Sequence, residues 1–348
     1  PRTLGQPLDK YSFVKRWRQE REFGRLVAAE VTDFRPDVVL SANTPLDAQA
    51  TLLKATRKHG AGFVFWLQDI IGVAAERILK DKVPVIGGAV GTYYVQKEKA
   101  LLRKSDHVVM ITEDFRPIMH DWGVDDARLH TVENWAPIEE LPLTAPDNAW
   151  AKQHGFDDAF VFLYAGTLAL KHNPDLLLQL ALRTRDRAKI VVLSQGPGAE
   201  WLREQQAAHR LDNLKVMGFK PFAEMPDALA AAAVLVAVLE PEAGVFSVPS
   251  KVLAYLCGAR PILLAVPPEN LAARIVDGYE AGFVVPPDDV SGFVERAERL
   301  LDDAALRARM GQHARAYAEA TFRIDGIAEA MEQVLALAAA EHGTRAAR

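Results

Sequence analysis

The chain has 348 residues, of which 49% are apolar and 25% are charged, and its formal charge at pH 7 is −5. This composition is ordinary for a globular protein of about two domains, and the negative charge gives no general attraction to nucleic acid. The single cysteine excludes an internal disulfide framework and a cysteine-rich metal site, and it fits a reducing compartment. Cys257 is expected to be a small buried apolar residue.

The N-terminal half begins with an amphipathic pattern that predicts a helix over 10–30. Short apolar runs then alternate with helical ones, which indicates a parallel sheet covered on both faces. The expected strands are 38–41, 63–67, 107–112 and 129–132, and the expected helices are 46–57, 93–103 and 115–122. This half therefore shows about four strands and is expected to be an incomplete doubly wound domain.

A linker is expected at 136–148, APIEELPLTAPDN, because it holds three prolines and has no clear periodicity. Behind it the expected strands are 160–165, 190–194, 214–217, 233–238, 261–265 and 282–285. The expected helices are 174–183, 199–209, 225–231, 251–256, 269–276, 290–301, 304–321 and 325–340. We therefore expect an N-terminal domain over 1–135, a C-terminal doubly wound domain over 149–320, and a final helical segment, 321–348, packing back toward the N-terminal domain.

Ligands bind such sheets at the carboxyl ends of the strands, so the loops after strands are the candidate sites. Gly166 and Thr167 form a small-residue turn that phosphate can approach, and Lys171 supplies a charge. A plain turn with a solvated lysine is the alternative. Gln195 and Gly196 end the next strand, where exposed backbone suits a nucleoside or forms a tight turn only.

The stretch 245–264, VFSVPSKVLAYLCGARPILL, begins a helix at Ser250 directly after a strand and a loop. The first N–H groups of a helix lack partners and the dipole is positive there, so a phosphate can bind, assisted by Ser250 and Lys251. An ordinary Ser250 N-cap is the alternative. The backbone at Phe219 offers contacts to a nucleobase in the same way.

Four motifs in order resemble the C-terminal domain of family-4 retaining glycosyltransferases of the GT-B fold: YAGTLALKHNPDLL, LSQGPG, MGFKPFAEMPDAL and FSVPSKVLAYLCGARPIL. In the N-terminal half, FVFWLQDI and ITEDFRPIMHDWGVDDARLHTVENWAP resemble the bacterial branch that builds colanic acid, O-antigen and other exopolysaccharides. The resemblance runs from about Val38 to the C-terminus. It implies an α/β protein with two Rossmann-like parallel-sheet domains facing a cleft, here without the family's first strand and glycine loop.

The resemblance implies a nucleotide diphosphate sugar as donor, with a UDP-sugar favoured. The positions carried over onto the diphosphate and sugar are Gly166, Thr167, Lys171, Ser247, Pro249, Ser250 and Lys251, and those near the nucleoside are Gln195, Gly196 and Phe219. The family's paired glutamates, eight residues apart, are replaced by Phe246 and Ala254. The ribose must therefore be held differently.

Neither an Asp-x-Asp strand end nor a His/Cys cluster with metal-ligand spacing occurs, so no metal and no other cofactor is expected. Lys171, Lys251 and the helix start at Ser250 are then expected to stabilise the leaving diphosphate. The resemblance implies front-face attack with retention. Asp69, at the tip of FWLQD, either orients or deprotonates the acceptor hydroxyl or caps the following turn. The remaining cleft candidates are Glu113 and Asn134, and the histidines expected to be structural or solvated are His120 and His172.

The run 77–104 has an apolar, glycine-broken centre with cationic flanks, which suits contact with anionic lipid. A buried loop with a solvated helix face is the alternative. The expected membrane-facing segments are Lys80–Lys104 and Lys10–Arg25. With these segments, the resemblance implies a cytoplasmic glycosyltransferase that is peripheral at the inner face of the membrane. It implies a polyisoprenoid-diphosphate-linked saccharide as acceptor, in lipopolysaccharide or exopolysaccharide synthesis. A nucleotide-sugar epimerase and a non-catalytic nucleotide-sugar-binding subunit are the alternatives, and no nucleic-acid partner is expected.

Overall fold

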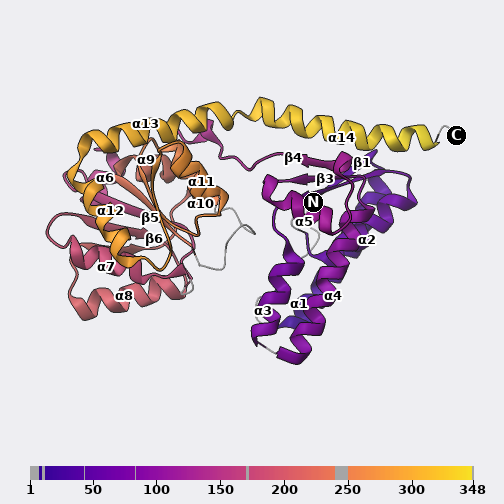
Figure 1. Ribbon diagram of the computed structural model, residues 1–348, viewed down its shortest axis with the longest axis horizontal. Helices are drawn as coiled ribbons and strands as arrows, with labels where there is room; N and C mark the ends of the chain where they lie inside the picture. The colour runs from indigo at the N-terminus through magenta and orange to yellow at the C-terminus, as the bar shows by residue number, and fades with distance from the viewer. Residues whose placement is uncertain are drawn as a thin grey trace. The chain divides into compact units, whose positions relative to one another are not determined.

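The computed structural model describes residues 8–9, 12–42, 44–82, 84–169, 172–239 and 250–346. The chain divides into two compact units, residues 1–133 with 325–348 and residues 134–324 (Figure 1). Each unit holds its own parallel sheet, the smaller one N-terminal, which confirms the expected α/β class. Residues 136–148, expected as a linker, lie in the second unit, where Ile138 and Leu141 are buried.

The N-terminal unit is built on four parallel strands in the order β1-β2-β3-β4. They are β1 Val38–Ala42, β2 Gly62–Leu67, β3 His107–Met110 and β4 Leu129–Thr131. The helices before and between them are α1 Phe13–Phe34, α2 Leu46–Lys58, α3 Ile71–Lys82, α4 Pro84–Lys104 and α5 Arg116–Asp121, with short 3-10 turns η1 Glu113–Phe115 and η2 Asp126–Arg128. Phe63, Val64 and Phe65 are successive residues of β2 and all are buried, so both faces of the sheet are covered.

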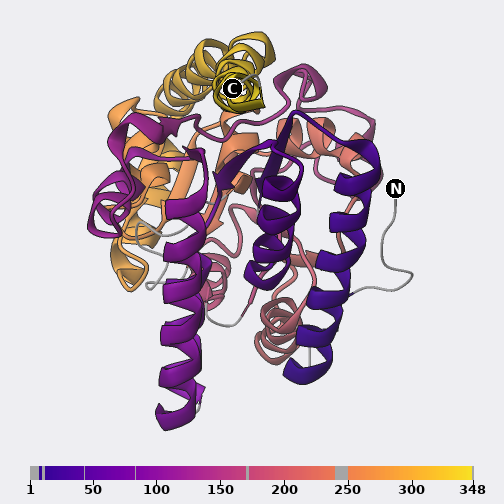
Figure 2. The same cartoon turned by 90° about the vertical axis from the view of Figure 1, so that its right-hand side faces the viewer.

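The segment 71–104 differs from the sequence expectation, because α3 and α4 form a helical hairpin where a glycine-broken run was expected before a helix at 93 (Figure 1). Its glycines let two helices touch. A Cβ on Gly87 would lie 2.0 Å from the carbonyl oxygen of Leu79, and one on Gly91 would lie 2.5 Å from Cα of Glu76. Close packing of the backbones therefore outweighs the low helix propensity of glycine. In Figure 2 the helix α4 is seen from the side, with the other long helices of its unit, α1 and α2.

The hairpin gives a first prediction, in which neighbouring glycines of α4 respond oppositely to alanine. Gly87→Ala should lower the free energy of unfolding by about 1–3 kcal/mol, because its Cβ has no room against α3. Gly88→Ala is the matched control: its nearest neighbours are Lys80 side-chain carbons at 3.9 Å, so the gain in helix propensity of about 1 kcal/mol should dominate. Urea unfolding followed by circular dichroism measures both, and equal effects would contradict the packing of the hairpin.

The C-terminal unit is built on six parallel strands in the order β10-β9-β8-β5-β6-β7. They are β5 Val161–Ala165, β6 Lys189–Leu193, β7 Leu214–Met217, β8 Val234–Val238, β9 Ile262–Ala265 and β10 Gly282–Val285. The helices are α6 Ala149–His154, α7 Asp175–Arg183, α8 Pro197–His209, α9 Met225–Ala231, α10 Ser250–Cys257, α11 Leu271–Gly278, α12 Val290–Asp302 and α13 Ala304–Thr321, with η3 Ile138–Glu140 and η5 Phe222–Glu224. Cys257 is fully buried in α10, as expected, and burial raises the pKa of its thiol to about 12.

The strand order fixes where a ligand can bind in this unit. From β5 the chain runs to β6 and β7 on one side of the sheet, and β8, β9 and β10 follow on the other side. The carboxyl ends of β5 and β8 therefore flank the point where the order reverses, which is where ligands bind in sheets of this kind. The functional site is expected at this edge.

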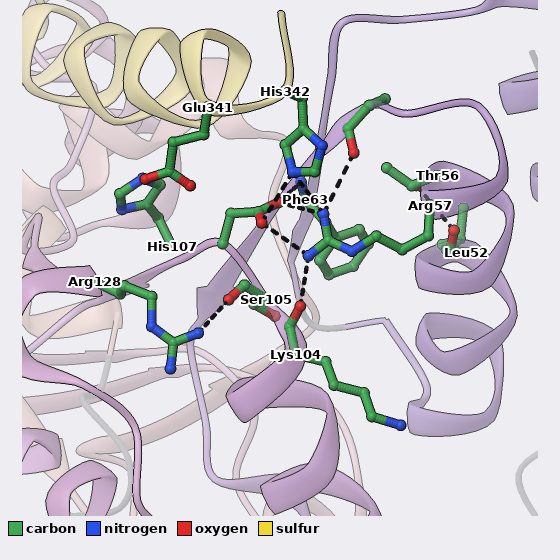
Figure 3. Close-up of polar contacts among 12 residues, drawn as sticks. Leu52, Thr56, Arg57, Phe63, Lys104, Ser105, His107, Arg128, Glu341 and His342 are labelled. Carbon is green, nitrogen blue, oxygen red and sulfur yellow. Dashed lines mark hydrogen bonds and ion pairs between the residues drawn. The ribbon is translucent and has the colours of Figure 1, made fainter. Parts of the chain in front are cut away.

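The last helix, α14 Ile324–Ala346, packs on the N-terminal sheet (Figure 1). Its apolar residues Val334 and Ala338 lie against Val64 of β2 and Val109 of β3. Near the end of α14, Glu341 and His342 reach toward the start of β3 (Figure 3), where His342 Nε2 lies 3.0 Å from the Asp106 carboxylate. Polar contacts thus reinforce an apolar interface.

Candidate active site

A cavity of about 580 Å³ lies at the carboxyl ends of the C-terminal strands. Its walls are the turn after β5, the end of β6, the loop after β7, the end of β8 and the first turns of α10. The residues that line it are Leu141, Ala165, Gly166, Thr167, His172, Leu193, Phe219, Lys220, Phe222, Met225, Leu239, Ser250, Lys251, Ala254 and Tyr255. The cavity therefore occupies the crevice that the strand order predicts.

The turn after β5 depends on Gly166, whose φ of +137° is a conformation that side chains with a Cβ rarely adopt. Its N–H donates to the carbonyl of Leu193 at 3.0 Å, which ties the turn to the end of β6. A Cβ at this position would also lie 3.1 Å from Cε of Lys251. Glycine is thus needed both for the bend and for the approach of Lys251.

Two buried tyrosines hold the same turn. The Ala165 N–H donates to the Tyr255 hydroxyl at 2.7 Å, and that hydroxyl lies 3.2 Å from the Ala165 carbonyl, to which it donates. The Tyr164 hydroxyl donates to the carbonyl of Thr167 at 2.7 Å. Burial raises the pKa of both phenols, so each stays neutral and keeps its hydrogen for the backbone.

Lys251 brings a desolvated cation to this turn from the first turn of α10. Its Nζ donates to the Tyr164 hydroxyl at 2.5 Å and lies 4.2 Å from the centroid of that ring. Burial lowers the pKa of Lys251 from 10.5 to about 8. Within the described part of the chain, no carboxylate forms an ion pair with it. An ammonium group buried without a counter-ion is stabilised strongly by an anionic ligand.

The loop after β7 places two aromatic rings at the cavity wall. Phe219 and Phe222 are 49% and 48% exposed although both line the cavity, so their faces are open to a planar ligand. Between them, Lys220 points to neighbouring groups of its own unit, with Nζ 3.3 Å from His154 Nε2 and 4.0 Å from the Glu224 carboxylate. Exposed aromatic faces of this kind can stack on a planar ring.

The described lining of the cavity includes lysine and histidine but no acidic side chain. Ala254, one turn after Ser250 on α10, contributes only a methyl group. The first turns of α10 therefore supply no carboxylate for ribose hydroxyls, in agreement with the sequence.

The expected residues that the structure brings together in this cavity are Gly166, Thr167, Phe219, Ser250 and Lys251. The expected residues outside the described residues are Lys171, Ser247 and Pro249. Gln195 is exposed at the end of β6 and does not line the cavity, although its Nε2 lies close to Gly218. Gly196, with φ +107°, is the N-cap of α8.

The other candidates lie elsewhere along the chain: Asp69 and Glu113 belong to the N-terminal unit, and Asn134 opens the C-terminal one. Asp69 lies in the turn between β2 and α3. Both carboxylate oxygens of Glu113 are engaged, by Arg116 at 2.6 Å and by the hydroxyl of Thr131. The hydrogen bond from Arg116 lowers the pKa of Glu113, which keeps it ionised and makes it a weak base.

Sequence reasoning missed several of these groups. Neither Tyr164 nor Tyr255 is among the site residues predicted from sequence, although Tyr255 follows Lys251 by four positions and so shares its helix face. His172, expected to be structural or solvated, lines the cavity. His120 has a partner that spacing did not suggest, because its Nε2 lies 2.9 Å from Asp126.

Two families match the chain in order. Residues 2–135 match the family described as Glycosyl transferase 4-like domain, and residues 159–303 match Glycosyl transferases group 1. The probable glycosyltransferase WbjE of Pseudomonas aeruginosa is 24% identical over 276 residues, which are 77% of this chain and 66% of WbjE. The alpha-D-kanosaminyltransferase of Streptomyces kanamyceticus is 25% identical over 225 residues, 62% of this chain and 56% of that protein. The chain thus spans 56% to 66% of these relatives.

The fold is also that of solved glycosyltransferase structures. HepE of Anabaena, crystallised with UDP, superposes with a TM-score of 0.73 at 14% identity, covering 90% of this chain and 82% of HepE. This likeness shows the GT-B fold. The chain belongs to the group 1, family-4-like glycosyltransferases.

Proposed function

We propose that the chain transfers a sugar from a nucleotide diphosphate sugar, with a UDP-sugar favoured, to a lipid-linked saccharide in bacterial surface polysaccharide synthesis. The observation that carries this proposal is the desolvated Lys251 beside the Gly166 turn. The cavity around them, about 580 Å³, is in the range of small-molecule sites. HepE, which shares the fold, has been crystallised with UDP and with UDP-glucose.

In this proposal the diphosphate lies between the Gly166–Thr167 turn and the start of α10. Gly166, which has no side chain, lets a phosphate approach the turn, and Ser250 supplies a hydroxyl and Lys251 an ammonium group. As the anomeric bond breaks, negative charge grows on the leaving diphosphate, and a preorganised cation stabilises that charge more than it stabilises the ground state. The residues assigned to the same anion by sequence are Lys171, Ser247 and Pro249.

The acceptor side of the reaction is assigned to the N-terminal unit. The acceptor hydroxyl attacks the anomeric carbon on the face that the diphosphate leaves, so the configuration is retained, and its proton passes to the departing phosphate oxygen. Asp69 orients that hydroxyl from the turn after β2. Glu113, being ion-paired, and Asn134 are secondary candidates.

Contact with the inner face of the cytoplasmic membrane is proposed through α1 and the α3–α4 hairpin. The described side chains of α1 include exposed Arg18, Arg21 and Arg25, with Val14 and Leu26 exposed among them. Cationic and apolar groups on one helix suit an anionic lipid surface. No helix in the described ranges is long and apolar enough to cross a membrane.

One alternative keeps support from a specific observation, namely a subunit that binds a nucleotide sugar without turning it over. The lining of the cavity, where described, lacks a carboxylate, and Ala254 contributes nothing polar to the ribose. An epimerase is less favoured, since that chemistry needs acid and base groups around the sugar. Release of nucleoside diphosphate that depends on the acceptor separates transfer from both alternatives.

The proposal predicts that nucleoside diphosphates and their sugars raise the unfolding temperature. A ligand at 100 times its Kd should add about 2.7 kcal/mol to the free energy of unfolding. A panel with uridine, thymidine, guanosine and adenosine diphosphates, with and without sugars, is followed by thermal unfolding. We expect UDP compounds to stabilise most and Lys171→Ala to abolish the shift. An unchanged shift in that variant would remove Lys171 from the phosphate site, and no shift with any nucleotide would refute the donor assignment.

A further inference from the structure

Glu98 is a fully buried carboxylate on α4, within the sequence Lys97-Glu98-Lys99. One carboxylate oxygen accepts a hydrogen bond from the Ile71 N–H at 3.0 Å, and the other accepts from the Gly72 N–H at 2.8 Å. Both donors lie in the first turn of α3, where N–H groups have no partner within their own helix. A side chain from α4 therefore caps α3 with both of its oxygens.

The close approach of the two helices at this point depends on Gly72. A Cβ there would lie 2.8 Å from the Glu98 carboxylate and 2.9 Å from the Cα of Val95. Only a glycine lets the backbone of α3 come near enough for the two hydrogen bonds. The contact therefore depends on one residue of each helix, Gly72 on α3 and Glu98 on α4.

The capped turn is the one that carries Asp69. Leu67 is paired within the sheet as part of β2, and the Ile71 N–H is hydrogen-bonded to Glu98. Both ends of the turn that contains Asp69 are therefore held in place. The same Ile71 N–H lies 3.1 Å from the carbonyl of Asp69, to which it also donates. We propose that Glu98 is a positioning residue for acceptor activation, holding the turn that carries Asp69. This inference rests on the role proposed for Asp69.

The strength of the two hydrogen bonds that Glu98 accepts should depend on pH, because burial and nearby charges affect its protonation. Burial raises the pKa of Glu98 to about 7 against the two N–H hydrogen bonds, and the nearby charge of Asp69 raises it further. On α3 the next carboxylate is Glu76, which pairs with Lys80. On α4 Lys97 is bound to Asp47 of α2. A protonated Glu98 cannot accept both hydrogen bonds with full strength, so the turn should loosen as pH falls below about 7.

The test is the pair of variants Glu98→Gln and Asp69→Asn, alone and combined, assayed by sugar transfer to acceptor at pH 8. Glu98→Gln should lower kcat by about 10- to 100-fold through misplacement of the acceptor, with the KM for the donor unchanged. The transfer rate of the unmodified protein should fall as pH decreases below about 7, whereas the rate of Glu98→Gln should not show this fall. Because Glu98 acts through Asp69, the double variant should be no slower than Asp69→Asn alone.

Glu76→Gln is the matched control, since it removes a carboxylate from α3 whose partners among the described residues are Lys80 and Thr92. Its rate should equal that of the unmodified protein. The thermal shift given by UDP confirms that each variant is folded. If Glu98→Gln slows transfer by the same factor in both backgrounds, or not at all, the positioning role is overturned. If Asp69→Asn transfers at full rate while UDP still binds, the acceptor role of Asp69 fails and the inference with it.

Discussion

The variant Lys251→Met should transfer sugar about 100- to 1,000-fold more slowly than the unmodified protein and should bind UDP too weakly to shift its unfolding temperature. Methionine keeps the unbranched apolar part of the side chain but removes the ammonium group and its charge. Burial already lowers the pKa of Lys251 to about 8, which means that the folded protein carries this cation at a cost. The ligand-free variant should therefore be at least as stable as the parent, so that lost binding cannot be attributed to unfolding.

The same lysine should make UDP binding depend on pH above neutrality. A bound diphosphate favours the ammonium form, so affinity should be level up to about pH 8 and fall as the free site loses its proton above that value. Calorimetry at pH 8.5 in buffers of different ionisation enthalpy should show proton uptake on binding. The free energy of unfolding of the ligand-free protein should change with pH in the opposite direction. The pKa of Lys251 is lower in the folded than in the unfolded protein, so burial of its charge destabilises the fold below about pH 8, and this destabilisation is relieved as pH rises from about 8 to 10.5.

Lys152→Met is the matched control for this prediction. Lys152 belongs to the same unit, lies on α6, and has a side chain that is 61% exposed near Asp147. Its loss should leave UDP affinity, its pH dependence and transfer unchanged. A Lys251→Met protein that still binds UDP within about threefold of the parent would show that the diphosphate lies elsewhere.

The strands could be predicted from sequence because buried parallel strands are short continuous apolar runs, and β5 and β8 are of this kind. The α3–α4 hairpin could not, because a glycine reads as a helix breaker until its packing partner is known. At Gly87 and Gly91 that partner is the backbone of α3, at Leu79 and Glu76. Local propensity and tertiary packing thus disagree there, and packing decides the structure.

The candidate site likewise contains residues that could be predicted from sequence and residues that could not. Gly166 and Lys251 could be linked from sequence, since parallel topology brings the ends of β5 and β8 to one edge and the helix after β8 follows them. The role of the Tyr164 hydroxyl could not, because Tyr164 lies in the continuous apolar run of β5, which indicates only that it is buried. Glu98 was also hidden, since a glutamate between two lysines on a helix is typical of a solvated face. What identifies it is the turn of α3 that lies against it.

Asp106→Ala is expected to give the largest loss of stability, about 3–5 kcal/mol in the unfolding of the N-terminal unit. The Asp106 carboxylate is 10% exposed and accepts from Arg57 at 2.7 and 2.9 Å, from the Phe63 N–H at 2.7 Å and from His342 at 3.0 Å (Figure 3). It therefore joins α2, β2 and α14. Its removal leaves the Arg57 charge and the Phe63 N–H without this acceptor in a largely buried place.

The pH dependence of this loss follows from the same contacts. Burial alone would raise the pKa of Asp106, but the hydrogen bonds from Arg57, Phe63 and His342 outweigh it and lower the pKa. A lowered pKa means that the stabilisation is present above the unfolded value of 3.8 and is lost as pH falls through the folded value. The difference between Asp106→Ala and the parent in urea unfolding should thus be full at pH 7 and shrink in acid.

The matched control is Asp126→Ala, because Asp126 also meets an arginine and a histidine, Arg116 at 2.6 Å and His120 at 2.9 Å, but its side chain is 66% exposed. Water screens that cluster, so its loss should barely change the free energy of unfolding. Hydrogen exchange provides a second readout: in Asp106→Ala the amides of α14 near His342 should exchange faster, whereas in Asp126→Ala they should not. Equal destabilisation by the two variants, or protection of α14 without Asp106, would mean that the apolar contacts of Val334 and Ala338 alone hold this helix.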